Sequence, residues 1–173
     1  VEKNLKNYAE VTDKKLTDLT VCIMDRDRHT KIINELKRLN VNIKLISDGD
    51  VSGALLVSDR KYNVDIFMGT GGGPEGVIAA SALHTLNCYF QGRFLFDSED
   101  SISRAKEMGI DNLNKKYDLN EIVSSESIFC ATAITSCDLM NGIIKKNDKF
   151  ITETIVTHRK PVLEKIKKEV SIT

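Results

Sequence analysis

The sequence lacks the features that would direct it to nucleic acid or to a membrane. It has no net charge, because 25 Lys and Arg residues balance 25 Asp and Glu residues. A neutral chain has no long-range attraction to polyphosphates or acidic lipid surfaces. No apolar run approaches the roughly 18 residues that a membrane-spanning helix requires. We therefore expect neither a nucleic-acid partner nor a membrane segment.

Cysteine pairs and familiar catalytic motifs are also missing. The cysteines Cys22, Cys88, Cys130 and Cys137 form no C-x-x-C pair, and three lie in apolar runs. Cysteine in such runs packs as a small hydrophobic residue, and we expect this of all four rather than metal ligation. Free thiols favour the cytosol, so we expect a cytoplasmic protein. No Walker-type G-x-x-x-x-G-K-[ST] occurs, nor a defensible Ser/His/Asp or Cys/His arrangement.

We expect one domain, and one that is part of a longer protein. With 173 residues and 41% hydrophobic content, the chain can bury one sizeable core. Nothing at its start resembles a signal peptide, and the sequence opens, without Met, on a charged helical pattern over residues 1–10. The prediction is a single α/β domain over residues 1–173.

Three apolar runs are each followed by a helical pattern, which predicts three strand–helix units. The strands are expected at residues 19–24, 41–46 and 64–68, from their apolar and β-branched content. Successive units of this kind build a parallel sheet with helices on both faces. Residues 92–97 are a candidate fourth strand, followed by a charged helix over residues 98–108.

The pattern changes after residue 111. Residues 128–134 and 150–156 are rich in strand formers and are predicted to pair antiparallel. Residues 159–170 are basic and amphipathic, and the apolar positions on their one face are Val162, Leu163, Ile166 and Val170. The predicted fold class is therefore α/β, with a mostly parallel sheet and antiparallel strands added by the C-terminal segment.

A glycine-rich turn follows the third predicted strand, where residues 69–77 read Gly-Thr-Gly-Gly-Gly-Pro-Glu-Gly-Val. Such a turn lets the backbone approach a ligand closely, and the start of the next helix favours an anion. Pro74 suits the first helical position. A plain tight turn is the alternative, but so dense a run of glycines favours a ligand site.

Glu75 is the unexpected residue of this turn. A bare carboxylate about 4 Å from a bound phosphate would repel it by about 4 kcal/mol at an effective dielectric of about 20. The helix terminus offsets only about 0.3–2 kcal/mol. A phosphate and Glu75 can therefore share this corner if a divalent cation bridges them.

The turn also contains a literal G-x-G-x-x-G at Gly71, Gly73 and Gly76, with Asp97 about 20 residues further on. This pattern occurs in dinucleotide-binding folds. The match is weak, because Glu75 would face the pyrophosphate and two strand–helix units precede the turn. A Rossmann-type nucleotide-binding module is the second interpretation.

A cationic cluster follows the first predicted strand. Arg26, Arg28 and His29 suit phosphate oxygens, although a solvated loop with ion pairs to Asp25 and Asp27 is equally consistent.

An acidic cluster follows the second predicted strand. Asp48-Gly49-Asp50 can bind a cation or sugar hydroxyls, or form a turn in which Asp50 caps the next helix. Because the carboxyl ends of parallel strands meet at one sheet edge, we expect the three clusters to converge there.

Together the clusters resemble a known family. The order Arg26-Asp27-Arg28-His29, Asp48-Gly49-Asp50-Val51 and the turn at residues 69–77 is similar to class II (GlpX-type) fructose-1,6-bisphosphatase and its sedoheptulose-bisphosphatase relatives. Residues 128–135 and 152–154 also resemble the family's C-terminal strands. The resemblance covers only the family's C-terminal half. The other half carries an Asp-Pro-x-Asp-Gly-Thr motif and most of the metal-binding acids.

The resemblance implies a role for each cluster. Glu75 would be a metal ligand, and no catalytic residue is assigned within this sequence. The sugar-phosphate positions would be Arg26, Asp27, Arg28, Asp48, Gly49, Asp50 and Gly72. The sequence departs from the family pattern at three positions, with Arg26 for lysine, Asp27 for proline and Ala133 for glycine. Because Asp27 adds a negative charge, its expected contact is through the backbone.

The resemblance also implies an activity for the intact enzyme. It would hydrolyse the 1-phosphate of fructose 1,6-bisphosphate, giving fructose 6-phosphate for gluconeogenesis, with sedoheptulose 1,7-bisphosphate as a further candidate substrate. A Mn²⁺ or Mg²⁺ ion would polarise the phosphoryl group and activate water. The expected partners are the N-terminal half of the same enzyme and further copies in a homo-oligomer. The isolated chain is expected to be inactive. A non-catalytic assembly domain is the third interpretation.

Overall fold

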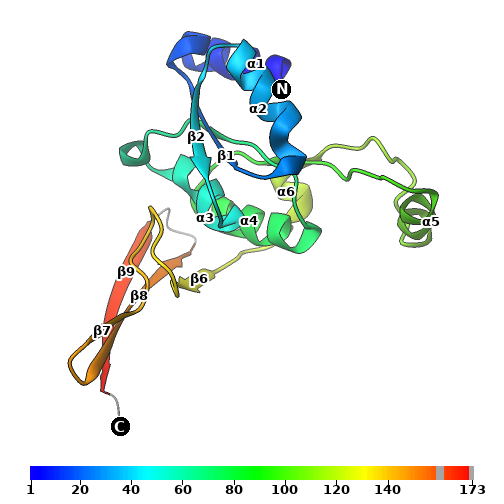
Figure 1. The fold of residues 1–173 in the computed structure, drawn as a ribbon. Helices are drawn as coiled ribbons and strands as arrows, with labels where there is room; N and C mark the ends of the chain where they lie inside the picture. Colours follow the sequence, from blue (N-terminus) through cyan, green and yellow to red (C-terminus); the bar gives the residue numbers. More distant parts are fainter. Residues whose placement is uncertain (159–161, 172–173) are drawn as a thin grey trace.

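The computed structural model describes residues 1–158 and 162–171. Helices and a parallel sheet form the body of the molecule, and an antiparallel sheet extends from it toward the C-terminus (Figure 1). The predicted α/β class is confirmed. Within the described residues, none of the helices has the length and apolar character to cross a membrane.

The three predicted strand–helix units build the parallel sheet. Its strands are β1 (Thr20–Met24), β2 (Asn42–Ile46) and β3 (Ile66–Phe67). They lie in the order β2-β1-β3, and β1 pairs in parallel with both neighbours. All five residues of β1 are buried, as expected of a central strand with helices on both faces.

Helices cover both faces of this sheet. The α-helices are α1 (Glu2–Thr12), α2 (Thr30–Arg38), α3 (Asp50–Leu55), α4 (Gly73–Thr85), α5 (Glu99–Glu107) and α6 (Leu119–Ile122). The short 3-10 helices are η1 (Leu16–Asp18), η2 (Asp27–His29), η3 (Leu56–Ser58) and η4 (Arg60–Tyr62). Val21 and Ile23 of β1 belong to the core formed with α1 and α2, whereas Cys22 belongs to the core formed with α3 and α4. Because side chains alternate between the two faces of β1, this strand contributes to both cores.

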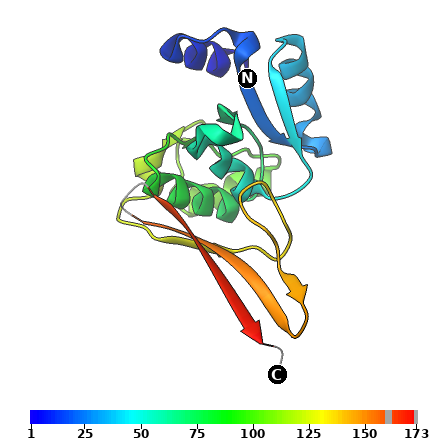
Figure 2. The same ribbon diagram turned by 90° about the vertical axis from the view of Figure 1, so that its left-hand side faces the viewer.

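The C-terminal strands form an antiparallel sheet around one central strand. They are β6 (Phe129–Thr132), β7 (Ile144–Lys146), β8 (Lys149–Thr157) and β9 (Leu163–Ser171). Strand β8 pairs with each of the others, which confirms the predicted pairing of residues 128–134 with 150–156. Ile155 lies in the core shared with α3 and α4, so this sheet is anchored at one end (Figure 2).

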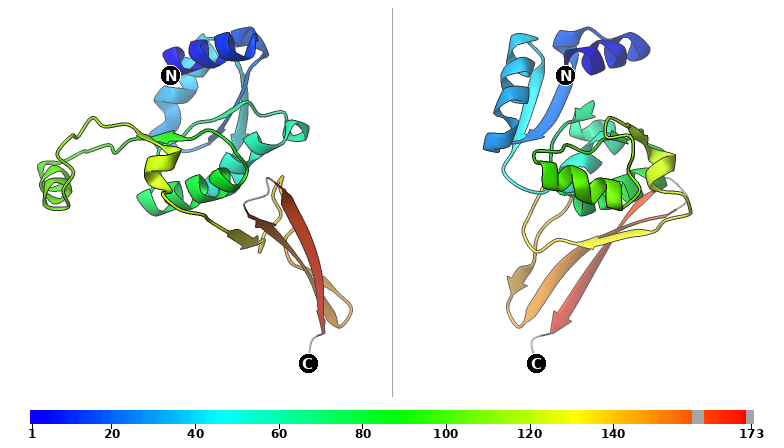
Figure 3. Two further views of the ribbon diagram at one scale, coloured as in Figure 1. Left: turned by 180° about the vertical axis from the view of Figure 1, so that it is seen from behind. Right: turned by 90° about the vertical axis from the view of Figure 1, so that its right-hand side faces the viewer.

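The predicted fourth strand at residues 92–97 is wrong. Instead, β4 (Gln91–Gly92) pairs antiparallel with β5 (Tyr117–Asp118), away from the parallel sheet. The chain between them carries α5 and projects from the body (Figure 3). The aromatic and apolar content of residues 92–97 suggests a strand, but among the described strands none of the parallel sheet pairs with this segment.

The shared apolar face expected for residues 159–170 is also wrong. Residues 159–161 lie outside the described part, and the segment from Leu163 is strand β9. Side chains alternate along a strand, so Leu163 faces the opposite way from Ile166 and Val170. The pairing of β9 along the whole of β8 satisfies its backbone, and this outweighs the local helical spacing.

The uniform burial expected of the cysteines is corrected in part. Cys22 is buried and Cys88 is half-buried, but Cys130 and Cys137 are exposed. Burial raises the pKa of the Cys22 thiol to about 11, so it stays protonated at neutral pH.

Candidate functional site

The three polar clusters meet at one edge of the parallel sheet, where its strands end. The backbone continues the sheet ladder into the loops, because Asp25 N–H donates to Ile46 C=O over 2.8 Å and Met68 N–H donates to Cys22 C=O over 3.0 Å. These bonds hold the starts of the three loops side by side.

His29 joins the first loop to the glycine turn. Its side chain is fully buried, and its Nδ1 lies 2.8 Å from the carbonyl oxygen of Met24, the last residue of β1. Its Nε2 lies 2.9 Å from the backbone nitrogen of Thr70. His29 is therefore not part of an exposed cationic patch, which corrects that interpretation.

The two arginines of the first loop reach the other two loops. Arg28 Nε donates to the Thr70 carbonyl over 2.6 Å. Arg26 Nη2 lies 3.4 Å from Asp48 Oδ1, and both side chains are largely exposed. Asp27 begins η2 and is exposed. The first loop thus contacts both the acidic cluster and the glycine turn, while its arginine side chains stay at the surface.

The helix-capping role that the sequence suggested for Asp50 belongs instead to Gly49. Gly49 is the N-cap of α3 and has φ of +93°, a left-handed conformation that favours glycine. Asp50 is the first residue of the helix, and its side chain makes no capping hydrogen bond. A side chain added at Gly71 would lie 3.5 Å from Asp50 Oδ2, so α3 begins beside the glycine turn.

Glu75 lies in the first turn of α4. The helix begins at Gly73, with Gly72 as its N-cap and Pro74 in its second rather than first position. No side chain caps this helix, so its first turn is open to a ligand. A methyl group added at Gly72 would overlap the Glu75 carboxylate, which shows that this side chain turns back over the loop.

A metal ion would find only part of its ligand shell here. Among the described residues, no group of three or more His, Cys, Asp or Glu side chains is placed to hold a metal. Glu75 is exposed and offers one carboxylate, a ligand type that hard divalent cations prefer. The described residues therefore do not form a complete metal site.

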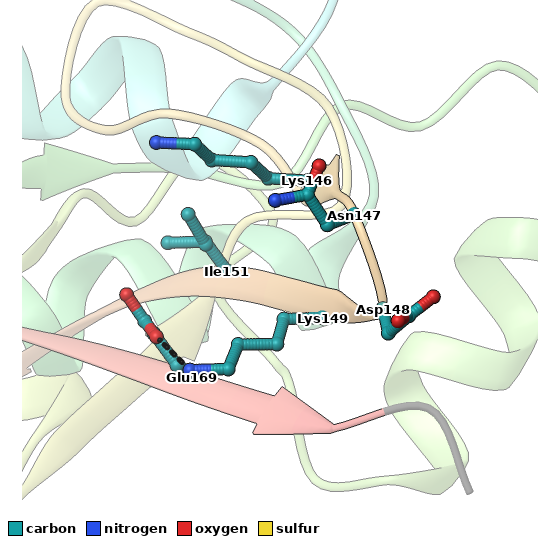
Figure 4. Close-up of a pocket in the computed structure, with 6 residues that line it drawn as sticks. All are labelled: Lys146, Asn147, Asp148, Lys149, Ile151 and Glu169. Carbon is teal, nitrogen blue, oxygen red and sulfur yellow. Dashed lines mark hydrogen bonds and ion pairs between the residues drawn. The ribbon is translucent and has the colours of Figure 1, made fainter.

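Two hollows on the described surface lie away from the strand ends. One lies beside the β7–β8 turn (Figure 4) and is lined by Lys146, Asn147, Asp148, Lys149, Ile151 and Glu169. A second lies between residues 94–96 and α5. Neither is lined by any residue of the three clusters. At the strand ends, Arg28, Asp48 and Glu75 are instead exposed at the surface of this chain.

Sequence reasoning missed a buried carboxylate on β8. Glu153 accepts hydrogen bonds from Asn141, and Lys167 Nζ lies 3.1 Å from its Oε1. The Asn141 side chain and backbone, and then Lys167, lower the pKa of Glu153 to about 2. The available signal was its position two residues before Ile155, on the buried face of the strand.

Comparison with known proteins identifies the family of this chain. An α/β fold with a glycine turn, arginines and acids gathered at the strand ends occurs in a broad class of proteins. A model of the family "Bacterial fructose-1,6-bisphosphatase, glpX-encoded" matches residues 1–170. The chain belongs to this family.

Curated relatives carry a common name. A "D-fructose 1,6-bisphosphatase class 2/sedoheptulose 1,7-bisphosphatase" of Synechococcus sp. (strain JA-2-3B'a(2-13)) is 39% identical over 168 residues, covering 90% of this chain and 48% of the relative. Proteins of the same name from Trichodesmium erythraeum and Synechococcus elongatus are each 38% identical over 154 residues, covering 82% of this chain and 45% of the relative. The chain thus spans about half the length of the curated relatives it matches.

Proposed function

We propose that this chain is the substrate- and metal-binding half of a metal-dependent sugar bisphosphatase of the cytoplasm. The intact enzyme would release the 1-phosphate of fructose 1,6-bisphosphate, or of sedoheptulose 1,7-bisphosphate, with a role in gluconeogenesis. The observation that carries the proposal is the convergence of arginines, aspartates and an open glycine turn at one sheet edge, in a chain of this family.

Each loop has a distinct part in the proposed site. Arg26 binds a phosphate. Arg28 binds the same phosphate through its Nη groups, because its Nε donates to the Thr70 carbonyl. Asp48 and Asp50 accept hydrogen bonds from sugar hydroxyls. The Asp27 contact is through its backbone, because its carboxylate would repel a phosphate.

The glycine turn supplies the remaining contacts. Gly72 lets the sugar phosphate approach the backbone before α4. Glu75 supplies one oxygen ligand to Mn²⁺ or Mg²⁺, and the other ligands come from the N-terminal half of the enzyme. Without those ligands this chain alone is inactive.

Phosphate release tests the proposal. The intact enzyme with Mn²⁺ should release phosphate from fructose 1,6-bisphosphate, whereas the 173-residue chain alone should release none. Glu75→Gln in the intact enzyme should abolish release, and Glu107→Gln, at an exposed position of α5, should retain it. Release by the isolated chain that disappears on Glu75→Gln would contradict the division between the two halves.

The nucleotide-binding interpretation has lost its structural support. Asp97 lies before α5 on the projecting segment, not at the end of a strand in the parallel sheet. Calorimetry with NAD should show no binding to the intact enzyme, whereas fructose 1,6-bisphosphate with Mn²⁺ should bind. An assembly domain would bind neither ligand.

A further inference from the structure

We propose that His29 is a positioning residue of this site, which holds the glycine turn in its binding conformation through the Thr70 backbone. The inference rests on the proposed function, because it assumes that this turn contacts the sugar phosphate and the metal. His29 itself is fully buried and touches neither.

The hydrogen-bond partners define the tautomer of the ring. The Met24 carbonyl can only accept, so Nδ1, 2.8 Å away, carries a proton and donates. Nε2 of the neutral ring then accepts from the Thr70 N–H over 2.9 Å. Nε2 also lies 3.0 Å from the Thr70 carbonyl oxygen, so with or without a proton on this nitrogen the ring is tied to the Thr70 backbone.

Thr70 is held from two directions. His29 binds its N–H, and Arg28 Nε donates to its C=O over 2.6 Å. Gly69 and Gly71 flank Thr70, and glycine has the greatest backbone freedom to lose on ordering. Thr70 is therefore the fixed point of a segment that would otherwise sample many conformations.

The residues proposed to contact ligand lie a few positions after Thr70 in the sequence. Gly72 comes two positions after Thr70 and caps α4, and Glu75 lies in the first turn of that helix. If the Thr70 contact is lost, a smaller fraction of molecules has the turn in its binding conformation. Apparent dissociation constants rise by the inverse of that fraction, whereas saturating ligand restores the bound conformation. The effect should fall on KM and on metal half-saturation more than on kcat.

Two substitutions in the intact enzyme separate the two hydrogen bonds. His29→Asn can keep the donor near Met24 but cannot reach Thr70, whereas His29→Gln can place an oxygen near the Nε2 position. We expect His29→Asn to raise KM and the Mn²⁺ half-saturation concentration about tenfold, as for a neutral hydrogen bond lost at a buried site. His29→Gln should stay within about threefold of wild type by the same reasoning. Equal values for wild type and His29→Asn, or a loss confined to kcat, would overturn the proposal.

Two measurements need no catalytic activity. Hydrogen exchange of the peptide over residues 69–76 should be faster in His29→Asn than in wild type, and restored in His29→Gln. The ¹⁵N spectrum of the His29 ring in the wild-type enzyme should show a ring protonated at Nδ1, the nitrogen that faces the Met24 carbonyl. A ring with no proton on Nδ1 would overturn the proposal even if both variants fail to fold, because the ring orientation that places Nε2 on Thr70 and Nδ1 on the Met24 carbonyl would then be wrong. An inactive wild-type enzyme with these two signatures would refute the proposed function alone.

Discussion

Asn141 donates two hydrogen bonds to the carboxylate of Glu153, one from its backbone N–H and one from its side-chain amide, each 2.8 Å long. Glu153 C=O also accepts from the Ala133 N–H over 3.2 Å. One residue of β8 therefore holds both ends of the loop over residues 133–142.

Glu153→Gln should weaken this loop in a pH-dependent way. The pKa of Glu153 in the folded protein is about 2, below its ordinary value of 4.5, so the ionised form is the one that stabilises the fold. The contribution is fully present above about pH 4.5 and is lost as the pH falls toward 2. Calorimetric melting of wild type and variant should therefore show a Tm difference that shrinks over this range. A constant difference would contradict the assignment, and Glu107→Gln on α5 controls for loss of a charge.

Two helix glycines should respond to alanine with opposite signs. A methyl group at Gly53 would lie 2.5 Å from Ile46 Cδ1 and 2.8 Å from the Phe67 ring, so Gly53→Ala should destabilise by about 1–3 kcal/mol through overpacking. A methyl group at Gly76 meets nothing within 4 Å, so Gly76→Ala should stabilise α4 by about 0.5–1 kcal/mol. Denaturant unfolding measures both changes. Stabilisation by Gly53→Ala would show that α3 packs less closely on the sheet than described.

Asp48→Asn should affect binding and leave stability unchanged. The ion pair of Asp48 with Arg26 is exposed and 3.4 Å long, and such pairs contribute at most about 1 kcal/mol. Loss of a charged acceptor for a sugar hydroxyl costs about 1.5–3 kcal/mol, so KM should rise tenfold or more. Asp100→Asn is the matched control, because Asp100 forms a similar exposed pair with Arg104 on α5. An equal KM for both variants would show that Asp48 is not part of the substrate site.

Gly72→Ala should displace the Glu75 carboxylate. The added methyl group overlaps that carboxylate, whose flexible side chain can swing away at little cost to the fold. We expect the Mn²⁺ half-saturation concentration to rise with little change in Tm. Gly73→Ala adds a methyl group that meets nothing within 4 Å and should shift it less. Identical metal dependence of the two variants would argue against Glu75 as a ligand in this conformation.

The elements that could be predicted are those whose signal is local. Strands β1 and β2 and helix α5 follow from apolar runs and from the charged helical pattern of residues 98–108. The glycine turn and Glu75 stand out because their residue types are unusual in any context. These features depend on neighbours within a few positions, which the sequence displays directly.

The remaining features depend on contacts between distant positions. The sequence groups His29 with the arginines of a cationic cluster, and only its approach to Thr70, 41 residues later, makes it a buried link between loops. Strand β9 owes its conformation to pairing with β8. The lowered pKa of Glu153 depends in the same way on hydrogen bonds from Asn141, which lies 12 residues earlier.

The sequence by itself thus determined which polar and glycine-rich clusters follow each strand of the parallel sheet. It determined this because parallel strand–helix units place such residues at one sheet edge whatever the details of packing. Only the tertiary structure decided which of them face solvent and which hold the others in place. The glycines on either side of Thr70 allow many backbone conformations. The buried ring of His29 bonds to the Thr70 backbone from 41 residues earlier, a contact that no local pattern encodes.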